Sequence, residues 1–116
     1  MRRPVYALLA AALLTVLAAC SIEERHPIIV AQDHVTVINM TDTAWTGVDV
    51  WLNDFYRAQV NQLLPGQRLD VPISVFTAGW GQRFDPKKQS PFGVEVTAMG
   101  SDGKPVHLTW GKGRRR

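Results

Sequence analysis

Apolar and polar residues alternate in short runs along most of the chain after residue 33, and a period of two is typical of a half-buried β-strand. In one such run Val48, Val50 and Leu52 share a face, while polar residues and one tryptophan occupy the other. We therefore predict six or seven short strands and no long amphipathic helix. The runs cover residues 35–39, 48–53, 56–60, 69–75, 94–98 and 106–110.

Turn-forming residues separate these runs. The stretch Leu64–Gln67 reads Leu-Pro-Gly-Gln, in which proline suits the second position of a β-turn and glycine accepts a positive φ at the third. The Asp-Gly pair in residues 101–104 is a hairpin signal, so the last two strands are predicted to form a hairpin. Pro72 cannot donate to a strand ladder, which predicts that its strand lies at a sheet edge or contains a bulge.

Two segments lack this alternation. The first runs from Phe76 to Pro91 and contains several glycines and prolines. We predict a long ordered loop here, with a helical turn around residues 76–84. The second, residues 21–33, is predicted to be a tether, although Ile28–Val30 within it could instead pair as an edge strand.

Short strands separated by turns predict an all-β fold, a small antiparallel β-sandwich with Ig-like packing, and a small β-barrel is the alternative. About half of the mature domain also resembles small bacterial Ig-like domains of the FxLYD type, with an Asn after the first strand and a Pro-Gly turn before a later one. The resemblance implies a non-catalytic extracytoplasmic module. It is carried by Val37-Ile38-Asn39, Trp45, Val48-Asp49-Val50, Leu64-Pro65-Gly66-Gln67 and Val75-Phe76.

The first twenty residues follow a different pattern. Arg2 and Arg3 precede an apolar run over residues 5–19, which ends in Ala18-Ala19-Cys20. A membrane-spanning helix needs roughly 20 apolar residues. The run here has 15 residues, a length typical of the apolar helix of a secretory signal peptide. An uncleaved signal anchor and an ordinary secreted protein are the alternatives.

This layout resembles a bacterial lipoprotein signal peptide with its lipobox. The resemblance implies cleavage between Ala19 and Cys20 and acylation of the Cys20 thiol. Two or more acyl chains give a stable membrane anchor. Ser21 stands after the cysteine where Asp would favour inner-membrane retention in Gram-negative lipoproteins. We therefore expect a cell-envelope protein, at the outer membrane and facing the periplasm if the host is Gram-negative.

These assignments divide the chain into four parts. Residues 1–19 are the predicted lipoprotein signal peptide, 20–33 a lipidated tether, 34–111 the β-sandwich domain and 112–116 a basic tail. The net charge of +3 includes Arg2 and Arg3, which leave with the signal, and three more arginines stand in the tail. The domain therefore lacks the clustered basic face of a nucleic-acid-binding protein.

Catalytic and metal-binding signatures are missing from the sequence. The three histidines, His26, His34 and His107, have no ligand spacing, and no serine lies in a Gly-x-Ser-x-Gly context. Cys20 is the single cysteine, so its acylation leaves no thiol for a disulfide or a thiolate site. We expect no enzymatic activity, no metal and no cofactor.

Aromatic residues remain as candidates for binding, because an exposed aromatic patch marks a contact with a protein or with the apolar face of a sugar. The leading hypothesis is a lipid-anchored, non-catalytic protein-binding or assembly module. A glycan- or peptidoglycan-binding module using exposed tryptophans and a small envelope enzyme are the alternatives, and the oligomeric state is left open. The candidate contact residues are Trp51, Trp80, Phe84, Lys87 and Lys88.

Overall fold

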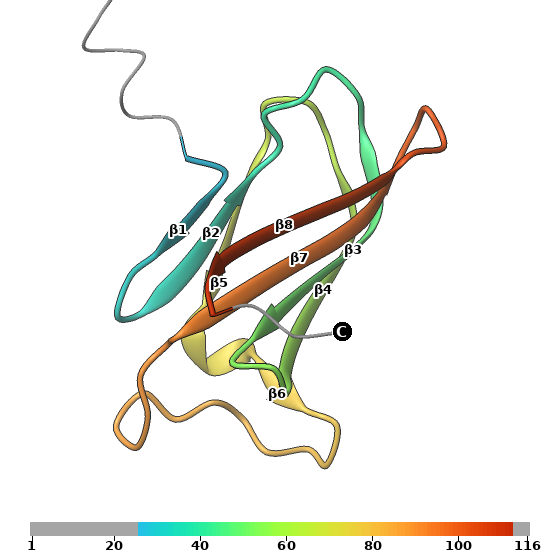
Figure 1. Cartoon of the computed structure of the whole chain (residues 1–116). Helices are drawn as coiled ribbons and strands as arrows, with labels where there is room; N and C mark the ends of the chain where they lie inside the picture. The colour runs from blue at the N-terminus through green and yellow to red at the C-terminus, as the bar shows by residue number, and fades with distance from the viewer. Residues whose placement is uncertain (1–25, 113–116) are drawn as a thin grey trace, which may run out of the picture.

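Two antiparallel β-sheets pack face to face in the computed structural model, which describes residues 26–112 (Figure 1). The sheets do not close into a barrel, so the predicted sandwich is confirmed and the barrel is excluded. The three-stranded sheet has the order β1 (Ile28–Val30), β2 (His34–Ile38), β5 (Arg68–Pro72). The five-stranded sheet has the order β6 (Thr77–Ala78), β4 (Tyr56–Leu63), β3 (Trp45–Leu52), β7 (Gly93–Gly100), β8 (Pro105–Gly111).

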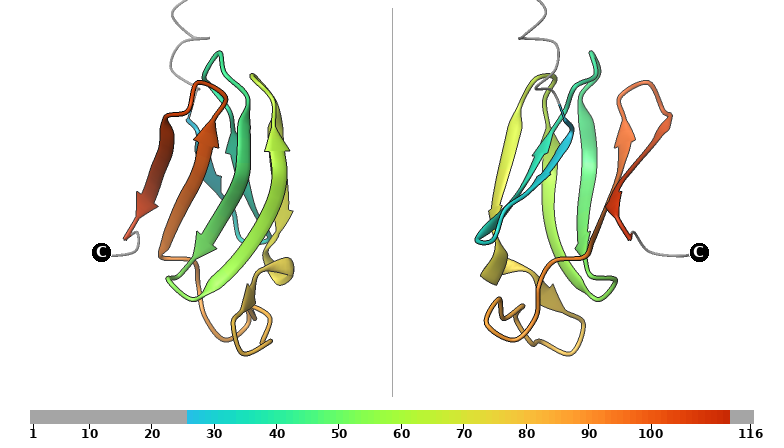
Figure 2. Two further views of the ribbon diagram at one scale, coloured as in Figure 1. Left: turned by 90° about the vertical axis from the view of Figure 1, so that its right-hand side faces the viewer. Right: turned by 60° about the vertical axis from the view of Figure 1, so that its left-hand side comes forward.

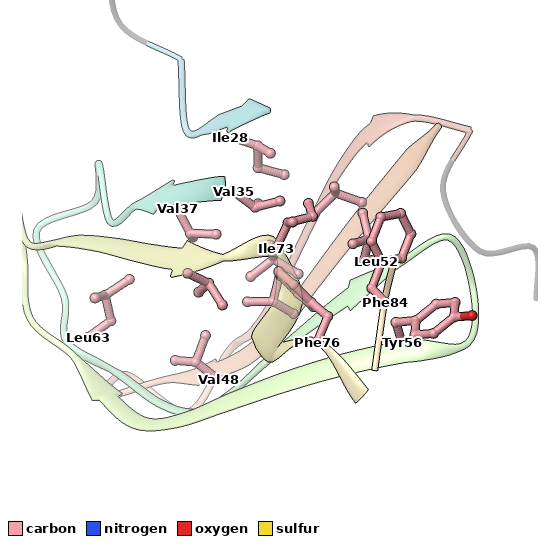
Figure 3. Packing of buried hydrophobic residues seen from close by; sticks show 14 of the residues in the cluster. Ile28, Val35, Val37, Val48, Leu52, Tyr56, Leu63, Ile73, Phe76 and Phe84 are labelled. Atoms are coloured by element: carbon pink, nitrogen blue, oxygen red, sulfur yellow. The ribbon is translucent and has the colours of Figure 1, made fainter. Parts of the chain in front are cut away.

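The core lies between the inner faces of the two sheets, where apolar side chains from both meet (Figure 3). Val48, Val50 and Leu52 of β3 are all buried, as the alternation predicts. Trp45, at the start of the same strand, is also buried and is the largest side chain of the core. Burial of such side chains is the main favourable contribution to the stability of a domain that has no disulfide.

The predicted turns are present. Gly66 adopts a φ of 75°, and the N–H of Gln67 donates to the carbonyl of Leu64 at 2.9 Å, which closes the Pro-Gly turn. Strands β7 and β8 pair as an antiparallel hairpin across residues 101–104. Pro72 ends β5, whose other edge has no partner strand within residues 26–112, so the predicted edge position is confirmed.

Two expectations need correction. Ile28–Val30 forms β1 and pairs with β2, so the sandwich begins at Ile28 and not at His34. The apolar side chain of Ile28 is buried in the core, which explains why this part of the predicted tether joins the sheet. The helical turn expected around residues 76–84 is instead the 3-10 turn η1 (Ile73–Val75), which follows directly after Pro72.

The alternating strand directions place the connections at two ends of the sandwich (Figures 1 and 2). We call the end that holds His26 and the turns 39–44, 64–67 and 101–104 the entry end, because the described chain begins there. We call the opposite end, which holds the turns 31–33 and 53–55 and the segment 73–92, the loop end. The aromatic residues outside regular strands gather at the loop end.

Candidate functional site

Asn53 organises the loop end from the turn between β3 and β4. Its side chain is 2% exposed, and its Oδ1 accepts hydrogen bonds from the N–H groups of Phe92 at 2.7 Å and Gly93 at 3.2 Å. Its Nδ2 donates to the carbonyl of Ser90 at 2.9 Å. Asn53 has a φ of 50°, a left-handed conformation that asparagine tolerates better than most residues. The turn therefore fixes the end of the long loop.

Aromatic packing fixes the middle of the same loop. Phe84 is 2% exposed and packs edge-on against Tyr56, with ring centroids 5.1 Å apart. The N–H of Phe84 donates to the carbonyl of Phe76 at 2.9 Å. Gln89 Nε2 donates to the Tyr56 hydroxyl at 2.9 Å. These contacts show why a segment with no strand pattern is nevertheless ordered, as expected from the sequence.

An exposed aromatic pair stands on this fixed base. Phe55 is 61% exposed and Trp80 is 64% exposed. Their ring centroids lie 6.1 Å apart with an angle of 53° between the planes, and Trp80 also contacts the Tyr56 ring edge-on at 6.4 Å. The Trp80 indole N–H donates to Gln82 Oε1 at 3.1 Å. We call Phe55 and Trp80 the aromatic pair.

A shallow groove of about 290 Å³ runs from Phe55 onto the outer face of the five-stranded sheet. Arg57 borders it, and its guanidinium lies 5.3 Å from the centroid of the Trp51 ring. Arg57 Nε and Nη2 also donate to Asp49 Oδ1, at 3.0 and 2.7 Å. Cation–π contact and hydrogen bonding hold Arg57 flat against the sheet, so one face of Trp51 is covered.

The same outer face carries a buried carboxylate that the sequence did not single out. Glu95 of β7 is 1% exposed, and its Oε2 lies 3.3 Å from Nε2 of His107 on β8. Trp51 on β3 is the residue that pairs with Glu95 on the neighbouring strand. A glutamate at an outward position is ordinarily solvated, so burial by its neighbours across the strands is visible only in the folded sheet.

Two carboxylates elsewhere have shifted acidity. The hydrogen bond that Thr36 Oγ1 donates to Asp70 Oδ1, at 2.5 Å, holds the pKa of Asp70 below its ordinary value, with a smaller contribution from Arg68. The pKa of Asp33 is lowered in the same way by its hydrogen bond with His34 at 2.7 Å. Asp33 lies in the turn 31–33 of the loop end and Asp70 lies on β5, and neither lines the groove beside Phe55.

The residues predicted to meet a partner fall into different environments. Trp80, Lys87 and Lys88 are exposed on the loop end. Phe84 is a core residue, so it offers no surface to a partner, and Trp51 lies half-buried under Arg57. Ala19 and Cys20 lie outside the described residues.

Phe55 is the exposed residue that sequence reasoning missed. The turn signal at Asn53-Asp54 was the available clue, because both residues adopt a positive φ, of 50° and 69°, and Phe55 follows directly. Within residues 26–112, no three His, Cys, Asp or Glu side chains lie close enough to hold a metal ion. The same residues include no helix of the length and hydropathy needed to cross a bilayer.

Comparisons of the chain with models of known protein families, with curated proteins and with solved structures found no match. The function is therefore inferred from the sequence of this chain and from the geometry of its sandwich.

Proposed function

We propose that this protein is a lipid-anchored, non-catalytic binding or assembly module of the cell envelope, and that its aromatic pair contacts a partner protein. The observation that carries the proposal is the exposure of Phe55 and Trp80 side by side on a loop end that is otherwise tightly bonded. Large aromatic side chains are the residues that most often dominate the free energy of protein association.

The rigidity of the loop end favours binding. The hydrogen bonds of Asn53 and the Tyr56–Phe84 contact tie the loop to the sandwich. A preordered surface loses less conformational entropy on association than a flexible one, so more of the interaction free energy appears as affinity. Lys87 and Lys88 on the same loop add positive charge, which favours encounter with an acidic partner.

The position of the loop end suits a partner away from the membrane. Six residue steps join the proposed lipid anchor at Cys20 to His26, and they span at most about 20 Å when extended. His26 lies at the entry end. Strands of up to eight residues, such as β3, separate the two ends by about 26 Å. An anchored molecule would therefore present the aromatic pair on its far end.

The geometry of the rings favours a protein over a glycan. A sugar stacks its apolar face on an open aromatic plane. The planes of the aromatic pair lie 53° apart, and the guanidinium of Arg57 covers one face of Trp51. Two rings in contact at this angle offer no single open plane to the flat face of a pyranose, and they suit an apolar pocket of a partner protein.

The anchor is tested by intact mass spectrometry of the membrane fraction from the native host, with a Cys20→Ala variant beside the wild type. We expect a chain that begins at Cys20 and carries acyl mass, and release of the variant from the membrane. A wild-type chain that retains residues 1–19 or carries no acyl group would contradict the anchor.

The binding surface is tested by crosslinking in the native envelope with a Phe55→Ser/Trp80→Ser double variant. The matched control is Met40→Ser/Met99→Ser, which removes two similarly exposed apolar side chains at the entry end. We expect at least one envelope protein to be lost with the first variant and retained with the second. Equal crosslinking by both variants would contradict a protein partner. Binding of the wild type to purified peptidoglycan that is lost when Trp80 is replaced would favour a glycan instead.

A further inference from the structure

Arg57 is the one charged residue among those that line the groove beside the aromatic pair. The groove lies at the loop end of β3, β4 and β6, which are neighbours in the five-stranded sheet (Figure 1). Phe55 belongs both to the groove and to the aromatic pair, so the pair and Arg57 form one continuous surface. The uncharged lining residues are Trp51, Phe55, Gln59, Thr77, Ala78 and Gly79.

The guanidinium of Arg57 is held in place by its neighbours. Its Nε and Nη2 both donate to Asp49 Oδ1, at 3.0 and 2.7 Å. The same oxygen accepts a hydrogen bond from Gln59 Nε2 at 2.8 Å. The centroid of the Trp51 ring lies 5.3 Å from the guanidinium carbon of Arg57. An arginine that is already bonded on one side and stacked on a ring loses less side-chain entropy when it binds a further group.

The bonds to Asp49 use only one side of this guanidinium. Both donors lie on its Nε–Nη2 side, whereas Nη1 of Arg57 bonds to no acceptor within residues 26–112. The Arg57 side chain is 40% exposed. A guanidinium has five N–H donors in one plane, and its Nη1–Nη2 end can hold a carboxylate through two parallel hydrogen bonds. Arg57 therefore has donors left for a second carboxylate.

Asp49 limits which acids gain from these donors. Its negative charge offsets the positive charge of Arg57, so the pair attracts distant anions weakly in water that contains salt. An acid gains the two hydrogen bonds only when it comes within contact distance of Nη1 and Nη2. A free anion has little reason to stay there. A carboxylate that belongs to a protein already seated on the aromatic pair is held at that distance by the neighbouring contact.

We propose that the partner protein carries an Asp or Glu side chain at the rim of the apolar pocket that receives the aromatic pair, and that this carboxylate binds the Nη1–Nη2 end of Arg57. The contact rests on the proposed function of the aromatic pair. Arg57 follows Phe55 by two residues, a separation of about 7 Å along a strand, so the carboxylate stands close beside the pocket. Lys87 and Lys88, exposed at the same end, also favour an acidic partner.

The experiment is photo-crosslinking in the native envelope with the full-length chain, in which a photoreactive side chain replaces the exposed Gln59 of the groove. We expect Arg57→Gln to lower the yield of the protein adduct at least about tenfold, because two charge-assisted hydrogen bonds are lost. The matched control is Arg68→Gln, which removes another exposed arginine that is paired with an aspartate, Asp70, on the other sheet. The control should change the yield less than about twofold.

Two further variants separate binding from a structural role of Arg57. Arg57→Lys should also lose the adduct, because lysine keeps the charge but has no planar pair of donors. Asp49→Asn should retain the adduct, because it breaks the ion pair and leaves the guanidinium in place. A structural role predicts the reverse order, with loss for Asp49→Asn and recovery for Arg57→Lys, and that order would overturn the proposed contact. Thermal unfolding of each variant verifies that its domain is folded.

Mass spectrometry of the adduct identifies the partner segment. An Asp or Glu in that segment, whose amide variant lowers the yield as far as Arg57→Gln does, supports the carboxylate contact, and a segment without one overturns it. If Phe55→Ser/Trp80→Ser abolishes the adduct but Arg57→Gln does not, the carboxylate contact fails and the proposed function stands. An adduct that neither variant changes, or no adduct from the chain with Arg57 and the aromatic pair intact, would contradict both.

Discussion

Asn39 and Asn53 are buried side-chain amides at opposite ends of the sandwich, and each ties a loop to a neighbouring strand. Asn39 is 0% exposed, and its Nδ2 donates to the carbonyls of Thr43 at 2.8 Å and Leu63 at 3.0 Å. Asn53 is 2% exposed and bonds to the backbone of Ser90, Phe92 and Gly93. Asn39 therefore orders the entry end, and Asn53 orders the loop end.

Replacing Asn53 by alanine should destabilise the fold and loosen the loop end. The change leaves the part-buried N–H of Phe92 and the buried N–H of Gly93 without their acceptor, and the loss of such a partner costs roughly 1–3 kcal/mol. We expect the free energy of unfolding in urea to fall by about 2–3 kcal/mol. Amide exchange in residues 79–92 should accelerate. A loss below about 0.5 kcal/mol would show that water replaces the side chain without cost.

Replacing Asn39 by alanine should have a similar effect on stability at the other end. The amide satisfies two carbonyls, and its Oδ1 accepts bonds from the N–H and the hydroxyl of Thr41, at 3.0 and 2.6 Å. We expect a loss of about 2–3 kcal/mol and faster amide exchange in residues 39–44. Amide exchange in residues 79–92 should accelerate only as far as the lower global stability requires. Equal local acceleration at both ends would contradict the separate roles of Asn39 and Asn53.

Phe84 and Trp80 should respond in opposite ways to truncation. Phe84→Ala removes a buried ring that packs against Tyr56, and such changes cost about 3–5 kcal/mol. Trp80→Ala removes a mostly exposed ring, and we expect a loss of less than about 1 kcal/mol. Thermal or urea unfolding of both variants measures the difference. A large loss for Trp80→Ala would make its ring a structural residue and would weaken the proposed contact surface.

Asp70 should make the stability of the fold depend on pH at the acid end. The Thr36 hydrogen bond lowers its pKa in the folded state below its ordinary value of 3.8. The ionised form is therefore favoured by folding, so its contribution is complete above that value and is lost as the pH falls through the lower folded pKa. We expect Asp70→Asn to be less stable than wild type at neutral pH and equal to it in strong acid.

Urea unfolding of wild type and Asp70→Asn at several pH values tests this linkage. The Asp70 side chain is about half exposed, so added salt should reduce the part of the difference that comes from Arg68. The hydrogen bond from Thr36 is short-ranged and should persist. A difference between the two proteins that stays constant down to strong acid would contradict the assignment.

Much of the fold could be predicted from the sequence because its strands are half-buried. Val48, Val50 and Leu52 lie on the inner face, Pro72 ends an edge strand, and the hairpin forms at residues 101–104. Period-two alternation and turn-forming residues are local properties, so they can be recognised in the sequence without knowledge of the partner strands. The lipobox at Cys20 remains a prediction from the same sequence.

The candidate surfaces depended on contacts between distant segments. Phe84 and Phe55 are both phenylalanines in irregular segments, yet one is buried against Tyr56 and the other is exposed beside Trp80. Likewise β6 pairs with β4 only at Tyr56 and Arg57, because it ends after two residues. The sequence by itself determined where strands form, because alternation is local. The tertiary structure decided which faces and edges are covered, because burial requires a second element to pack against the first.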